Sequence, residues 1–105
     1  MNLVNCIVTI TGAGGGLGAG MARRFAGLGA RLALVDLRAE LMDELVAELG
    51  LPAEDCRAFA CNVGDEKEVD RTFDEIAAHF GGLDVLVNNA GITRDALTVK
   101  FRDGE

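Results

Sequence analysis

Thr11-Gly12-Ala13-Gly14-Gly15-Gly16-Leu17-Gly18 is the stretch of sequence that decides the fold of this chain. It lies between a short apolar run, residues 3–11, and a helical pattern that begins at Leu17. Glycines at such a junction let the backbone turn tightly and approach a pyrophosphate, whose charge meets the N–H groups at the helix N-terminus. The loop therefore predicts a dinucleotide-binding unit.

Two glycine registers fit this loop. The spacing Gly14-x-Gly16-x-x-Ala19 satisfies the general dinucleotide fingerprint, and Gly12-x-x-x-Gly16-x-Gly18 satisfies a longer-spaced form. We favour the longer form, because it begins at the end of the strand and leaves the next apolar residue to start the stripe of the helix.

The longer register gives the other glycines different roles. Gly14 and Gly15 become turn residues, and Leu17 begins the apolar stripe of the helix. Gly20 lies inside the helix, where glycine costs about 1 kcal/mol relative to alanine. We therefore expect Gly20 to allow close packing rather than to touch a ligand.

Strand-like and helical segments alternate along the rest of the chain. Short apolar runs predict strands, and apolar residues three or four positions apart predict helices. The expected strands cover residues 3–11, 31–36, 57–63 and 83–87, and the expected helices cover residues 17–28, 41–49 and 66–80. Asp65 is a plausible N-cap for the last helix, and the polar end, residues 100–105, is expected to trail off.

The second and third helices should each bury one apolar stripe. The stripe of the second helix consists of Leu41, Leu45, Val46 and Leu49, and that of the third consists of Val69, Phe73, Ile76, Ala77 and Phe80. Strands that alternate with such helices form right-handed βαβ units, which give a parallel sheet with helices on both faces.

The fold class expected is therefore α/β, a Rossmann-type doubly wound parallel sheet. The strand order should be 3-2-1-4, because the first strand must be central to present its loop where the winding reverses. No change of composition divides the chain, so residues 1–105 are expected to form one unit, an incomplete half-domain of this fold.

Asp36 ends the second expected strand and matches the acidic residue that accepts hydrogen bonds from the adenosine ribose. Its carboxylate would repel a 2′-phosphate, so NAD is the expected cofactor, with Leu37 beside it among the cofactor-binding residues. Arg38 keeps NADP open as an alternative. An aspartate after a strand can also be only a helix cap.

Composition and charge exclude several classes of function. Half of the 105 residues are hydrophobic, the net charge is −7, and no basic run is present, so neither nucleic acid nor an anionic membrane is an expected partner. No apolar stretch resembles a signal peptide or a membrane span, which predicts a cytoplasmic protein. Cys6, Cys56, Cys61 and the lone His79 suggest neither a disulfide framework nor a metal site.

Two motifs together resemble the short-chain dehydrogenase/reductase family. The family's phosphate loop has the form Thr-Gly-x-x-x-Gly-x-Gly, which Thr11 to Gly18 match, and its fourth strand ends in Asn-Asn-Ala-Gly, which Asn88 to Gly91 match. The resemblance covers the whole chain. It implies an NAD(P)-dependent oxidoreductase.

The resemblance also implies a cofactor-binding role for residues at three strand ends. The residues of the diphosphate and nicotinamide path are Gly12, Gly16, Leu17 and Gly18, those of the adenine pocket are Asn62 and Val63, and those beside the nicotinamide ribose are Asn89, Ala90 and Gly91. The family more often has aspartate at position 62, and asparagine keeps the carbonyl acceptor without the charge. Asn88 is expected to be structural, bonding backbone between neighbouring strands.

The string from Asn89 to Asp95 resembles the bacterial 3-oxoacyl-[acyl-carrier-protein] reductases and the acetoacetyl-CoA reductases. Asp36 departs from the usual NADPH preference of those reductases. An NAD-linked 3-hydroxyacyl or secondary-alcohol dehydrogenase is therefore an alternative. In either case the resemblance implies a small-molecule or acyl-thioester substrate and a homo-oligomer at full length.

The family's chemistry needs a tyrosine, a lysine four residues later, a serine and an asparagine in a helix after the fourth strand. This sequence contains no tyrosine, and Lys100 is no substitute for the proton donor. We therefore assign no catalytic residue and expect an inactive, cofactor-binding half of an enzyme. A non-catalytic NAD-binding module is the alternative. A methyltransferase-type domain is disfavoured by the Asn88 to Gly91 string and the loop spacing.

Overall fold

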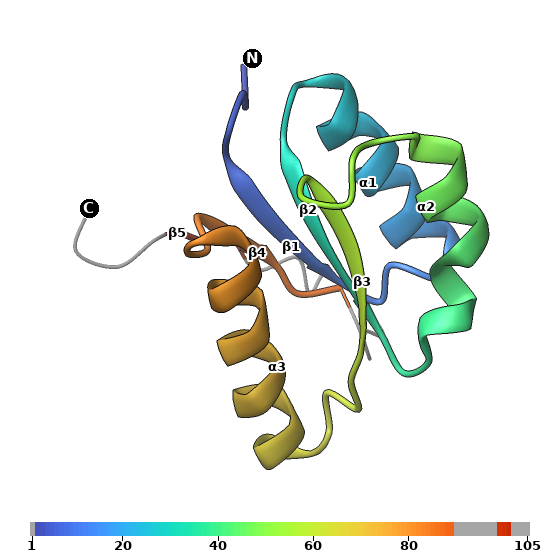
Figure 1. The fold of residues 1–105 in the computed structure, drawn as a ribbon. Coiled ribbons are helices and arrows are strands. Elements are labelled where there is room, and N and C mark those ends of the chain that lie inside the picture. Colours follow the sequence, from blue (N-terminus) through green and yellow to red (C-terminus); the bar gives the residue numbers. More distant parts are fainter. Residues whose placement is uncertain (1, 90–98, 102–105) are drawn as a thin grey trace.

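A five-stranded sheet with helices on both faces forms the computed structural model, which describes residues 2–89 and 99–101 (Figure 1). The elements in chain order are β1 (Ile7–Thr11), α1 (Gly16–Gly27), β2 (Arg31–Asp36), the 3-10 helix η1 (Ala39–Met42), α2 (Asp43–Leu49), β3 (Cys56–Ala60), α3 (Glu66–Phe80), β4 (Val85–Val87) and β5 (Val99–Phe101). In Figure 1, α1 and α2 cover one face and α3 covers the other. No helix among the described residues is long and apolar enough to cross a bilayer.

The sheet has the order β3-β2-β1-β4-β5, so the predicted order 3-2-1-4 is confirmed. Strands β1 to β4 are parallel to one another, as right-handed βαβ units require. Strand β5 differs from our expectation of a trailing end, because it pairs antiparallel with β4, Val87 opposite Val99. The outer edge of β4 offers unpaired N–H and C=O groups, and β5 satisfies them.

The buried strands divide the core into two clusters, one on each face of the sheet. Side chains alternate along β1, so Val8 and Ile10 join the cluster under α1 and α2, whereas Ile7 joins the cluster under α3. Both faces are covered, which explains why the strands are almost continuously apolar in sequence.

Capping residues fix the ends of α2 and α3 as predicted. The Asp65 carboxylate accepts hydrogen bonds from the backbone N–H groups of Lys67 and Glu68, at 3.0 and 3.3 Å. At the other end of α3, Gly81 adopts a left-handed φ of +87°, and Gly50 ends α2 with a φ of +64°.

Three strand boundaries differ from those predicted. Strand β1 begins at Ile7 instead of residue 3, because Asn5 has a positive φ of 67° and breaks the extended backbone. Strand β3 runs from Cys56 to Ala60 instead of residues 57–63, and a turn follows in which the Gly64 N–H donates to Asn62 Oδ1 at 2.9 Å. Strand β4 begins at Val85 instead of residue 83.

Three residues assigned to apolar stripes do not belong to the core. Leu17 is 70% exposed and Leu41 is 43% exposed, and Ala77 is exposed as well. Leu17 lies in the first turn of α1, at the edge of the sheet. The 3-10 turn of η1 changes the helical phase, so Met42 is buried where Leu41 was expected. On α3 the buried position that the apolar pattern missed is Thr72.

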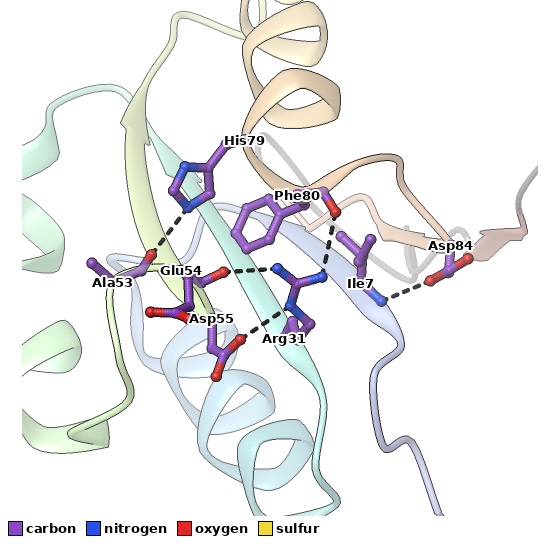
Figure 2. Close-up of polar contacts among 8 residues, drawn as sticks. All are labelled: Ile7, Arg31, Ala53, Glu54, Asp55, His79, Phe80 and Asp84. Carbon is purple, nitrogen blue, oxygen red and sulfur yellow. Dashed lines mark hydrogen bonds and ion pairs between the residues drawn. The ribbon is translucent and has the colours of Figure 1, made fainter.

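Arg31 joins three segments at the amino ends of the strands (Figure 2). Its guanidinium group donates to the Asp55 carboxylate at 3.1 Å, to the Glu54 carbonyl at 2.9 Å and to the Phe80 carbonyl at 3.3 Å. The Phe80 ring also lies 5.3 Å from the guanidinium carbon. Arg31 therefore ties β2 to the segment before β3 and to the end of α3.

We expect Arg31→Met to lower the free energy of unfolding by about 1 to 2 kcal/mol, because it leaves two carbonyls and a half-buried carboxylate without their donor. Urea denaturation of the two proteins measures this. The matched control is Arg23→Met, which removes an exposed ion pair with Glu48 and should cause no measurable change. Equal losses for the two variants would contradict the role given to Arg31.

Candidate dinucleotide-binding site

The residues predicted to bind a cofactor follow the carboxyl ends of the parallel strands. The glycine loop follows β1, which ends at Thr11, and Asp36 ends β2, whereas Asn62 and Asn89 follow β3 and β4 by two residues each. Because the four strands are parallel, the loop and these three residues lie at one edge of the sheet. Ligands of open α/β sheets bind in the crevice at this edge.

The phosphate loop turns tightly between β1 and α1. Gly12 has a left-handed φ of +69°, and the Gly15 N–H closes a turn onto the Gly12 carbonyl at 3.2 Å. Helix α1 then begins at Gly16, with no side-chain cap and no acidic residue in its first turn. The first N–H groups of this helix are therefore suited to an anion.

The glycines of the loop have different structural reasons for lacking a side chain. At Gly18 an added Cβ would overlap the Gly12 carbonyl, so the helix packs directly on the loop backbone. At Gly14 an added Cβ would lie 2.8 Å from both Asp36 Oδ2 and Leu41 Cβ. Packing within the protein therefore accounts for both of these glycines, whether or not a ligand binds nearby.

Gly15 and Gly16 face open space instead. Both are exposed. Among the described residues, the nearest atom to a Cβ on Gly15 is 3.7 Å away, and a Cβ on Gly16 would meet nothing within 4 Å. Here a side chain would fill only the space in front of the helix, which a diphosphate would need. Gly20 is also exposed with nothing within 4 Å, so our expectation that it allows close packing was wrong.

Asp36 is bonded through both of its carboxylate oxygens. Oδ2 accepts from the Gly14 N–H and Oδ1 accepts from the Leu37 N–H, each at 2.7 Å. The residue does not cap the following helix, because η1 has Arg38 at its N-cap position and no side-chain cap. The carboxylate therefore bonds both the phosphate loop and the residue that follows β2.

Large apolar side chains are exposed around this carboxylate. Leu37 is 59% exposed and Val63 is 41% exposed, and they follow two adjacent strands. Asn62 is also exposed, but its Oδ1 is occupied by the Gly64 N–H, and its own N–H donates to Glu68 Oε1 at 3.0 Å. The side-chain amide nitrogen of Asn62 and the second lone pair of its Oδ1 are thus the groups that a ligand could use.

Thr11 connects the first and fourth strands through its hydroxyl. The hydroxyl oxygen accepts from the Asn89 N–H at 2.8 Å and lies 3.1 Å from Asn88 Oδ1. Asn88 therefore has the structural role that was predicted, although it meets a side chain rather than the backbone. The Asn89 amide donates to the Gly12 carbonyl at 3.4 Å and so reaches the phosphate loop.

Two further predicted residues, Ala90 and Gly91, lie outside the residues that the structure describes.

Sequence reasoning also missed some contacts of the site. Nothing in the spacing indicated that Leu41 would lie against Gly14, or that Glu68 would bond the backbone at Asn62. Both contacts join residues that are close only after the chain has folded.

A pocket of about 280 Å³ lies on the α3 face, below the carboxyl edge of the sheet. It is lined by Thr11, Val35, Cys61, Val63, Val69, Phe73, Leu86 and Asn88. Its walls are mainly apolar, with polar groups of Thr11 and Asn88 at the edge where the glycine loop begins. No alternation pattern in the sequence indicated it.

The cysteines contribute no metal site. Cys56 and Cys61 are buried, and none of the three cysteines forms a disulfide. Burial raises the pKa of the Cys56 thiol, and the adjacent Asp55 carboxylate adds to the effect. Within residues 2–89 and 99–101, no three metal-ligating side chains come together.

The sequence matches the short chain dehydrogenase family over residues 6–105. It is 46% identical over 88 residues to D-threitol dehydrogenase of Mycolicibacterium smegmatis, covering 84% of this chain and 34% of that protein. It is 38% identical over 104 residues to 3-oxoacyl-[acyl-carrier-protein] reductase FabG of Thermotoga maritima, covering 98% of this chain and 42% of that protein. The chain thus spans well under half the length of these relatives.

Solved structures give the same picture. The crystal structure of 3-ketoacyl-(acyl-carrier-protein) reductase from Brucella melitensis complexed with NADH has a TM-score of 0.79 and 38% identity, covering 87% of this chain and 36% of that one. A metagenomic short-chain oxidoreductase in complex with NADP has a TM-score of 0.77 and 30% identity, covering 85% of this chain and 40% of that one.

We expect Gly18→Ala and Gly20→Ala to change stability in opposite directions. The Cβ at position 18 must displace the Gly12 backbone, so Gly18→Ala should lower the free energy of unfolding by about 1 to 3 kcal/mol. At position 20 the Cβ meets nothing, so Gly20→Ala should raise it by up to about 1 kcal/mol. Urea denaturation measures both, and two changes of the same sign would contradict this account of the loop.

Proposed function

Because the chain belongs to the short-chain dehydrogenase family, we propose that it forms the dinucleotide-binding part of an NAD-dependent oxidoreductase. One observation carries the proposal. The glycine loop opens at the N-terminus of α1, and the Asp36 carboxylate lies against the same loop, 2.7 Å from the Gly14 nitrogen. The groups suited to a diphosphate and to a ribose diol are therefore neighbours.

The residues present fit an extended dinucleotide. The N–H groups of Gly16, Leu17 and Gly18 would hold the diphosphate, since they belong to the uncapped first turn of α1, where Gly16 leaves open space. Asp36 would accept hydrogen bonds from the adenosine ribose. When bound, NAD supplies the hydride chemistry, which the protein only orients.

The remaining predicted residues would complete the cofactor site. Leu37 and Val63 would offer exposed apolar surface to the adenine ring. Asn62 directly precedes Val63, and its side-chain amide would contact the same ring. Asn89 would lie beside the nicotinamide ribose, as would Ala90 and Gly91. The Thr11 hydroxyl contacts the Asn89 N–H and Asn88 Oδ1, and so it holds the segment after β4 to the end of β1.

We favour NAD over NADP for an electrostatic reason. The Asp36 carboxylate lies against the phosphate loop, and both of its oxygens accept backbone N–H bonds there. A 2′-phosphate placed there would meet a negative charge. Arg38 is exposed at the start of η1 and is the nearest basic residue along the chain, so NADP stays the second candidate.

The substrate of the whole oxidoreductase is proposed at the level of its class. Similarity to a 3-oxoacyl-[acyl-carrier-protein] reductase and to D-threitol dehydrogenase supports a 3-oxoacyl thioester or a secondary alcohol. An NAD-binding module without catalysis is the second candidate.

We expect the chain to bind NAD more tightly than NADP, and Asp36→Ala to narrow or reverse the difference. The substitution removes both the acceptor for the ribose hydroxyls and the charge that repels a 2′-phosphate. Calorimetric titration of both cofactors into both proteins measures the ratio of the two dissociation constants. A preference of the unmutated chain for NADP would contradict the role given to Asp36.

Two alanine variants serve as position controls in the same titration. Gly16→Ala and Gly20→Ala each place a Cβ where the protein has nothing within 4 Å. Only the first of these side chains would enter the proposed diphosphate space. Gly16→Ala should therefore weaken NAD binding, whereas Gly20→Ala should leave it unchanged.

We expect the 105-residue chain alone to show no turnover of 3-oxoacyl thioesters or simple secondary alcohols. It has no tyrosine to serve as the proton donor, and positioned acid–base catalysis typically contributes about 10²- to 10⁴-fold. Absorbance of NADH at saturating cofactor measures the rate. Joining the chain to the C-terminal part of a family member, with its tyrosine and lysine, should give turnover. Ordinary enzymatic rates from the chain alone would contradict the proposal.

A further inference from the structure

The carboxylate of Asp36 bonds a segment that lies far away along the chain. Its Oδ2 accepts from the Gly14 N–H, 22 positions earlier, at 2.7 Å. A second tie runs in parallel, because the Ala13 N–H donates to the Val35 carbonyl at 3.1 Å. Residues 13 and 14 are thus bonded to the end of β2, although Gly14 is exposed, as are Gly15 and Gly16.

Position 14 is shaped for this contact. A Cβ there would lie 2.8 Å from Asp36 Oδ2 and 2.8 Å from Leu41 Cβ, both too close for a real side chain. Glycine therefore lets the loop backbone approach the carboxylate. The bond is charge-assisted, and such bonds are roughly twice as strong as those between neutral groups.

We propose that Asp36 is a positioning residue for the phosphate loop, which it holds in its anion-binding shape through the Gly14 N–H. The inference rests on the proposed function and adds a second role to the contact with ribose. The two roles are compatible, since a carboxylate has about four acceptor positions and only two are used by Gly14 and Leu37.

The two effects of Asp36 on a bound phosphate have opposite signs. Its charge repels a phosphate group, so neutralising it should strengthen binding. Its bond to Gly14 orders the loop, so losing the bond should weaken binding. Inorganic pyrophosphate has no ribose, and it therefore reports on these two effects without the ribose contact.

The test compares Asp36→Asn with Asp36→Ala in titrations of the 105-residue chain with pyrophosphate, followed by NMR. Both variants lack the charge, but asparagine keeps an oxygen that can accept from the Gly14 N–H. We expect Asp36→Asn to bind pyrophosphate at least as tightly as the unmutated chain, and Asp36→Ala to bind it roughly tenfold more weakly than Asp36→Asn. The proposal would be overturned if Asp36→Ala bound pyrophosphate as tightly as Asp36→Asn does, or more tightly.

Gly14→Ala provides an independent variant that keeps the charge. Its Cβ must push the carboxylate or Leu41 away, so pyrophosphate should bind more weakly, whereas Gly20→Ala should bind as the unmutated chain does. Unchanged binding by Gly14→Ala would also overturn the proposal. This arm answers the question even if Asp36→Ala does not fold.

The amide proton of Gly14 tests the contact without any ligand. Bonded to a carboxylate, it should resonate downfield, and it should move upfield in Asp36→Ala but less so in Asp36→Asn. If this signal behaves as expected but neither NAD nor pyrophosphate binds, the proposed function fails and the positioning role fails with it. If NAD binds but the chemical shift of the Gly14 amide proton is the same in the unmutated chain and in Asp36→Ala, only the positioning role is refuted.

Discussion

The backbone of residues 12–18 passes so close to itself that Gly18 has no room for a side chain, and the placement of α1 depends on this contact. The first turn of the helix packs on the Gly12 carbonyl, and Gly12 itself takes a left-handed conformation to allow it. Once α1 is fixed there, its buried Ala22 meets the core on the face that it shares with α2. The same contact sets the N-terminus of α1 at the carboxyl edge of the sheet. One steric requirement thus determines both the packing of a layer and the direction of an anion-binding helix end.

The two ends of the sheet have separate tasks. At the amino ends of the strands, Arg31 joins the end of α3 to the segment before β3 (Figure 2). At the carboxyl ends, Asp36 accepts a hydrogen bond from the glycine loop and the Asn89 side chain donates one to it, and Leu37 and Val63 are exposed beyond the strand ends. Stabilising contacts at one end leave the other end free to keep open space around Gly16, where a side chain would be tolerated by the fold alone. This is the space that the proposed diphosphate would need.

The sequence predicted what depends on local pattern and missed what depends on tertiary contacts. Strand β2 was placed correctly, because a short run of four apolar residues between charged ones is typical of a buried strand, and the Asp65 cap and the Gly50 and Gly81 ends follow from local chemistry. Leu41 was assigned to the core because a 3.6-residue period was assumed, but the 3-10 turn of η1 changes the phase. The site residues of the strand ends could be named from motifs, whereas the bond between Asp36 and Gly14 could not, since it joins two residues that only the parallel pairing of β1 and β2 brings together. The antiparallel pairing of β5 was missed because three residues give no periodic signal.

In the proposed dinucleotide site, the acid at the end of β2 and the glycine at position 14 of the loop depend on each other. A carboxylate can satisfy the loop N–H, its own following N–H and two ligand hydroxyls, because it accepts in about four directions and donates in none. Asparagine would offer one oxygen for the same partners, and a side chain at position 14 would hold the carboxylate away from the loop. The two residues are therefore interdependent. In the proposed complex Asp36 can discriminate between NAD and NADP only while position 14 leaves room for its carboxylate. Alanine at either position should disturb both the shape of the loop and the preference between NAD and NADP, although only Asp36 would touch the ribose in the proposed complex.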